Sequence, residues 1–111
     1  MTQDSLHELM ARLRRDYLSE MPARLEDLRR TAREWLAGGA PEPPLETLFH
    51  RLAGSAGAYG YTDVSTLCRA AERFMGTAPG PSAETAARLE ATILGLEQAF
   101  RRGPTGPDIT A

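Results

Sequence analysis

Apolar side chains recur every three or four positions along most of the chain, which is the spacing of one face of an α-helix. The first run spans residues 6–36 and continues in phase across Pro22. Proline removes a backbone donor, so the pattern predicts either one long helix with a kink or two abutting helices. We expect Ser5 and Glu8 to form a capping box at its start. Its apolar face consists of Leu6, Met10, Leu13, Tyr17, Met21, Leu25, Leu28, Ala32 and Trp35.

Three shorter runs with helical spacing follow. The connector APEPP, residues 40–44, precedes a predicted helix over residues 45–59. Thr62 is expected to cap the next helix and Ser82 the last one, which ends at Gly103. The inward stripe of the helix at 45–59 is Leu45, Leu48, Phe49, Leu52 and Ala56.

Four amphipathic segments joined by short connectors, without any strand pattern, predict an all-α fold. The expected architecture is an up-and-down antiparallel four-helix bundle over residues 1–103, whose first helix is long and kinked or broken at Pro22. We expect residues 104–111 to be a disordered tail. A chain of 111 residues has room for one such domain.

The composition narrows the function classes. Hydrophobic residues make up 41% and charged residues 25% of the chain, values that are ordinary for globular proteins. The net charge of −2 offers no attraction for a phosphate backbone, so we do not expect nucleic acid as a partner. All 13 basic residues are arginine, a bias that suggests GC-rich bacterial coding.

The single cysteine and the N-terminal pattern both favour the cytoplasm. Cys68 excludes an intramolecular disulfide and a cysteine-rich zinc site, and its spacing predicts a small side chain in the core. No stretch has the apolar length of a signal peptide or a membrane span. We therefore expect a cytoplasmic protein without a membrane partner.

The stretch FHRLAGSAGAYGY around His50 has the most unusual pattern in the chain. His50 is expected to face solvent, because it lies about 160° around the predicted helix from Leu52. Its own face continues with small residues, at Ala53, Gly54 and Gly57. Glycine costs up to about 1 kcal/mol against alanine inside a helix, so the two glycines require a reason. They let either a neighbouring helix cross closely or a second protein approach the imidazole.

This run, H-R-L-A-G-S-A-G-A-Y-G, resembles the signature of histidine-containing phosphotransfer (HPt) domains, commonly H-x-L-K-G-[SA]-[SA]-x-x-x-G. The resemblance makes His50 the phosphoacceptor, Leu52 a buried side chain and Gly54 the residue that provides clearance. The lysine that is common at the fourth position of the signature is Ala53 here. Arg51 is a candidate to supply the missing charge.

The chemistry of an exposed imidazole agrees with this role. In its neutral form the ring carries a free nitrogen that is nucleophilic without a dedicated base, and phosphorus is a natural electrophile for it. Glu46, one helical turn before His50, is a candidate to accept a hydrogen bond from Nδ1–H and leave Nε2 as the attacking nitrogen. The second histidine, His7, belongs to no motif and is expected to be a surface residue.

The resemblance implies a phosphorelay carrier of a bacterial two-component system, a phosphoprotein that is not an enzyme and has no ATP site of its own. Its partners would be response-regulator receiver domains and a hybrid sensor kinase, and its expected state is a monomer. No cofactor or metal is expected in this chain, because the receiver would bring the magnesium ion. The residues expected to provide receiver access or docking are Arg51, Ala53, Gly54, Gly57, Leu9 and Met10.

Three other functions compete with this one. The dimerisation and phosphoacceptor module of a sensor kinase also presents a helical histidine, but Arg51 and Ser55 differ from its usual acidic residue and proline. A ferritin-like metal bundle requires inward Glu-x-x-His pairs, whereas Glu46 and His50 have a different spacing and His50 faces outward. A helical interaction module without phosphotransfer shares the fold, and the sequence leaves it open.

Overall fold

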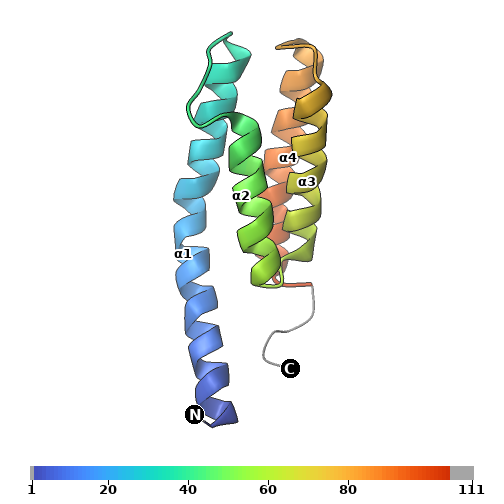
Figure 1. The fold of residues 1–111 in the computed structure, drawn as a ribbon. Helices are drawn as coiled ribbons and strands as arrows, with labels where there is room; N and C mark the ends of the chain where they lie inside the picture. The colour runs from blue at the N-terminus through green and yellow to red at the C-terminus, as the bar shows by residue number, and fades with distance from the viewer. Residues whose placement is uncertain (1, 106–111) are drawn as a thin grey trace.

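The computed structural model describes residues 2–105, which form four helices. They are α1 (Gln3–Leu36), α2 (Leu45–Ala58), α3 (Thr62–Thr77) and α4 (Ala83–Arg102). Figure 1 shows that consecutive helices run antiparallel and lie side by side as an up-and-down bundle. The predicted all-α four-helix fold is therefore confirmed. In the described part of the chain, none of the helices has the length and apolar character needed to cross a membrane.

α1 is one continuous helix through Pro22. Pro22 is exposed, so its ring takes no place in the core. The flanking side chains of Met21 and Leu25 stay buried, at 3% and 7% exposure. Of the arrangements that the proline allowed, the structure adopts the single helix.

α1 and α4 both begin with a side-chain cap. The hydroxyl of Thr2 accepts a hydrogen bond of 3.1 Å from the backbone N–H of Ser5, so Thr2 caps α1 in place of the expected Ser5 and Glu8 pair. Ser5 already lies in the first turn, because α1 starts earlier than its apolar pattern does. Ser82 caps α4 as predicted, and its hydroxyl accepts a hydrogen bond of 3.1 Å from the backbone N–H of Thr85.

The turn between α2 and α3 is tight. α2 ends at Ala58, one residue before the predicted end, and Gly60 reverses the chain with a φ of +85°. The next residue, Tyr61, is 1% exposed, and its backbone carbonyl accepts the hydrogen bond from the N–H of Ser65 in α3. Thr62 therefore lies inside α3, and the expectation that it caps this helix is wrong.

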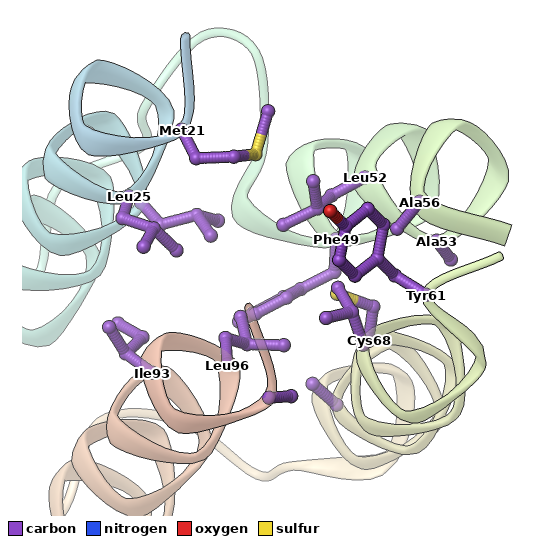
Figure 2. Close-up of a cluster of buried hydrophobic side chains, with 14 of the residues drawn as sticks. Met21, Leu25, Phe49, Leu52, Ala53, Ala56, Tyr61, Cys68, Ile93 and Leu96 are labelled. Atoms are coloured by element: carbon purple, nitrogen blue, oxygen red, sulfur yellow. The ribbon is translucent and has the colours of Figure 1, made fainter. Parts of the chain in front are cut away.

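The core lies between the helices and draws on all four of them. Phe49 of α2, Cys68 of α3 and Leu96 of α4 have no exposed surface. Burial of this apolar surface drives the helices together and fixes which face of each one looks outward. Figure 2 shows a set of these side chains meeting in the core, among them Met21, Leu25, Phe49, Leu52, Ala53, Ala56, Tyr61, Cys68, Ile93 and Leu96.

The N-terminal part of α1 extends beyond the ends of the other helices (Figure 1). Its apolar side chains therefore lack neighbours from the bundle, and Leu6 is 41% and Leu13 37% exposed. Leu9 and Met10 are half-buried. The apolar spacing predicts this helix correctly, but only the portion from Tyr17 onward contributes buried side chains.

Of the expected tail at 104–111, Pro104 and Thr105 belong to the described residues. The backbone N–H of Thr105 donates a hydrogen bond of 3.0 Å to the carbonyl of Gly60, which ties the end of α4 to the turn between α2 and α3. Residues 106–111 lie outside the described part of the chain.

Cys68 is fully buried, and this burial raises the pKa of its thiol from 9.0 to about 12, with the nearby charge of Glu72 adding to the shift. We predict that a thiol reagent at about pH 8 leaves the folded protein unmodified and reacts readily once the protein is unfolded. Because the folded-state pKa lies above the unfolded value, the stabilisation by this thiol is complete below about pH 9 and is lost as the pH rises through 12. Rapid modification of the folded protein would contradict the buried position.

Candidate functional site

His50 stands on the outer face of α2. Its side chain is 69% exposed, whereas Phe49 is fully buried and Leu52 is 5% exposed. The apolar stripe anchors one side of α2 in the core, and the step of about 100° per residue then turns the imidazole outward. The prediction that His50 faces solvent is confirmed.

The Nδ1 atom of His50 is held by Glu72 of α3. It lies 3.0 Å from Oε1 and 3.2 Å from Oε2 of that carboxylate. A carboxylate only accepts hydrogen bonds, so Nδ1 carries the proton, and in the neutral ring Nε2 keeps its lone pair. The ring is thus held in the tautomer whose free nitrogen points away from Glu72.

This partner differs from the one expected from the sequence. Glu46 precedes His50 by one turn on the same helix, but the carboxylate at Nδ1 belongs to Glu72, 22 positions later in the chain. The contact depends on the register in which the turn at Gly60 pairs α2 with α3, and periodicity along one helix carries no such information. The signal that the sequence did contain is the shortness of that turn, which makes α2 and α3 antiparallel neighbours.

The two glycines near the imidazole have different surroundings. A Cβ atom placed on Gly54 would meet no atom within 4 Å, so no other helix crosses there. A Cβ atom on Gly57 would lie 3.4 Å from the Oγ atom of Ser65, at the contact between α2 and α3. Close helix packing therefore does not explain Gly54, and the space over this residue is open to a second protein.

Ala53 is buried, which corrects the expectation that it flanks the histidine on the open face. Its side chain is 1% exposed and belongs to the core cluster. From His50 to Ala53 the helix turns by about 300°, which places the methyl group only about 60° from the imidazole but on the side of α2 that packs against α3 (Figure 2). A receiver cannot touch the side chain of Ala53 in this arrangement.

Arg51 and the extension of α1 lie away from the imidazole. Arg51 is exposed and lines a hollow of about 320 Å³ together with Arg24 and Leu28 of α1. It therefore occupies the side of α2 that faces α1, whereas the imidazole is bonded to α3. Leu9 and Met10 lie on the extension of α1, and their contact with a receiver stays a prediction.

The sequence model of the Hpt domain family matches residues 12–102, which include most of α1 and all of α2, α3 and α4. The chain belongs to the Hpt domain family. No curated protein and no solved structure matches it. Hpt domains are histidine phosphotransfer carriers that interact with the receiver domains of response regulators, so the expected family is confirmed.

The site of this Hpt domain has the parts that a phosphoryl carrier needs. A single imidazole offers an accessible nucleophilic nitrogen, one carboxylate sets its tautomer, and an open position on α2 leaves room for an approaching protein. Hpt domains are phosphocarriers rather than catalysts. The geometry accordingly supports acceptance and release of a group on Nε2.

Proposed function

We propose that this Hpt domain accepts a phosphoryl group on Nε2 of His50 from a receiver aspartate and passes it to the aspartate of another receiver. One observation carries the proposal: the ring is exposed, its Nδ1 atom is bonded to Glu72, and its Nε2 atom is left with a lone pair. The family match supports the choice of histidine, because residues 12–102 include His50 and leave out His7, the only other histidine in the chain.

The transfer is a direct exchange of bonds at phosphorus. The lone pair of Nε2 forms a bond to phosphorus while the bond from phosphorus to the aspartyl oxygen breaks, and the receiver carboxylate leaves with that electron pair. Nδ1 keeps its proton throughout, so the ring gains a positive charge. The carboxylate of Glu72 faces this charge across a bond of 3.0 Å. The reverse exchange delivers the group to the next receiver.

The receiver approaches His50 over a face with few side chains. Gly54 and Ala58, one and two turns after His50 on α2, are both exposed. Loops of the partner can therefore come close to Nε2 without displacing a side chain. One copy of the chain holds both His50 and Glu72, so the expected working unit is a monomer.

Leu9 and Met10 are proposed as an outer part of the docking surface. The hydroxyl groups of Tyr17 and Ser55 are hydrogen-bonded at 2.9 Å, which aligns α1 with α2. With this alignment Leu9 and Met10 lie about 20 Å from His50 along the bundle axis. An interface of about 800 Å² per partner has a radius of about 16 Å, so a receiver covers both His50 and these side chains only when its footprint is centred between them.

Incubation of the intact protein with a receiver domain that carries phosphate on its aspartate tests the proposed function. We expect a protein-bound phosphate that acid releases and base does not, as for a phosphorus–nitrogen bond. Mass spectrometry should locate it on His50. A label on another residue, or no label from any receiver of the source organism, would contradict the proposal.

Glu72 is expected to act as a positioning residue for this transfer. In Glu72→Ala, Nδ1 loses its acceptor, and the ring populates the tautomer in which Nε2 carries the proton and has no lone pair to attack with. A hydrogen bond worth about 1 kcal/mol predicts a transfer rate lower by roughly fivefold. Nitrogen NMR of the imidazole should show the Nδ1–H form in the native protein and a shift toward the Nε2–H form in the variant.

Glu46→Ala is the matched control for this prediction. It removes a carboxylate from α2 one turn before His50, yet Nδ1 is bonded to Glu72 instead. The tautomer ratio and the transfer rate of Glu46→Ala should therefore equal those of the native protein. Equal losses in Glu46→Ala and Glu72→Ala would mean that general surface charge, and not the bond to Nδ1, governs the rate.

A further inference from the structure

A phosphoryl group on His50 would enter a surface that carries carboxylates. Glu72 lies against Nδ1, and Glu46 is one turn before His50 on α2. The phosphoryl group adds up to two further negative charges close to these carboxylates. A neighbouring cation would offset that charge, and an arginine is suited to it because its planar guanidinium donates paired hydrogen bonds to phosphoryl oxygens.

Two contacts define how α2 and α3 are aligned. His50 is bonded to Glu72, and Gly57 faces Ser65. Gly57 is seven residues after His50, and Ser65 is seven residues before Glu72, so the helices keep one antiparallel register between the two contacts. Within this register Arg69 lies opposite Ala53, three residues from the level of His50. That offset is about 4.5 Å along the helix axes.

Arg69 is directed toward the open side of this pair of helices. It lies about 60° around α3 from Glu72 and is exposed. Cys68, which lies on the other side of Glu72, is fully buried. Among the described residues no hydrogen bond or ion pair holds its guanidinium. Ala53, opposite Arg69 on α2, is a small side chain that is 1% exposed.

We propose that Arg69 binds the phosphoryl group carried on Nε2 of His50, an inference that rests on the proposed function. Adjacent helix axes are about 8–10 Å apart, and the length of an arginine side chain spans the separation between the two residues. Arg69 thereby supplies from α3 the positive charge that α2 lacks at Ala53. Arg51 does not serve this purpose, because it lies on the side of α2 that faces α1.

Phosphoramidate as a small phosphate donor isolates this contact from receiver docking. Nε2 takes the phosphoryl group, the phosphorus–nitrogen bond of the donor breaks, and ammonia leaves. Contacts between exposed charges are worth up to about 1 kcal/mol, so Arg69→Ala should lower both the labelling rate and the lifetime of phosphorylated His50 by about three- to fivefold. Arg69→Lys should recover part of the loss, and added salt should shrink the difference from the native protein.

Arg51→Ala is the matched control. Arg51 is an exposed arginine next to His50 in the chain, but it lies on the side of α2 that faces α1. The Arg51→Ala variant should be labelled as fast as the native protein. No loss in Arg69→Ala, or an equal loss in Arg51→Ala, would overturn the role of Arg69 while leaving His50 as acceptor. Absence of phosphate on His50 in the native protein would overturn the proposed function, and this inference with it.

Discussion

Replacing His50 by glutamine is expected to abolish labelling by a phosphorylated receiver while leaving the bundle intact. The amide has no lone pair on nitrogen that can displace an aspartyl phosphate, so no slower route through the same residue remains. The side chain is 69% exposed, and its one hydrogen bond to Glu72 is on the surface. The free energy of unfolding should therefore change by less than about 0.5 kcal/mol. Transfer assays and denaturant unfolding of the same preparation measure both effects.

The control for this variant is His7→Gln. His7 is exposed on the extension of α1 and lies outside residues 12–102 that match the family. The His7→Gln variant should be phosphorylated on His50 as fast as the native protein. Persistence of an acid-labile label in His50→Gln would show that another residue accepts the phosphoryl group.

A glutamate in place of Gly54 is expected to block transfer by occupying the space through which the receiver approaches. The new carboxylate would stand beside the imidazole and repel the incoming phosphoryl group. A misplacement of about 1 Å in the reacting atoms already costs about 100-fold in rate, so we expect a loss of at least that order. Single-turnover transfer from a phosphorylated receiver measures it.

Stability distinguishes this steric effect from damage to the fold. A Cβ atom on Gly54 meets nothing within 4 Å, so Gly54→Glu should fold normally. Gly54→Ala should even gain about 0.5–1 kcal/mol in the free energy of unfolding, because glycine is unfavourable inside a helix. Strong destabilisation of both variants would instead favour a packing role for Gly54.

Ala91→Glu provides the matched control for Gly54→Glu. Ala91 is an exposed residue of α4, the helix diagonally across the bundle from α2 (Figure 2). The Ala91→Glu variant therefore carries the same new carboxylate at an exposed helical position far from the imidazole. Transfer to this variant should be unchanged, and a comparable loss there would attribute the effect of Gly54→Glu to net charge.

Local periodicity was enough to predict the helices and the direction of His50. Burial of Phe49 and Leu52 sets the orientation of α2, and the regular step of the helix then places the imidazole outside. Ser82 was found for a similar reason, since its bond to Thr85 spans three residues. The glycine at Gly54 marked the open side of the site because a helix rarely retains an unfavourable residue at an exposed position without cause.

The remaining features required the arrangement of the helices in space. Glu72, and not Glu46, meets Nδ1 because the turn at Gly60 sets the register of α3 against α2. Ala53 is buried because a neighbouring part of the bundle covers it, although it shares a spacing with exposed residues. The apolar stripe of α1 continues past the point where its neighbours end, which leaves Leu6 and Leu13 exposed.

The sequence by itself therefore determined which residues form helices, which side of each helix is apolar, and that one histidine stands clear of the core. Periodicity carries this information because it arises from contacts within a single helix turn or two. Only the tertiary structure decided which helix lies beside His50 and at what height along it. Those two choices come from the joint packing of all four helices, and they select Glu72 as the partner of the imidazole.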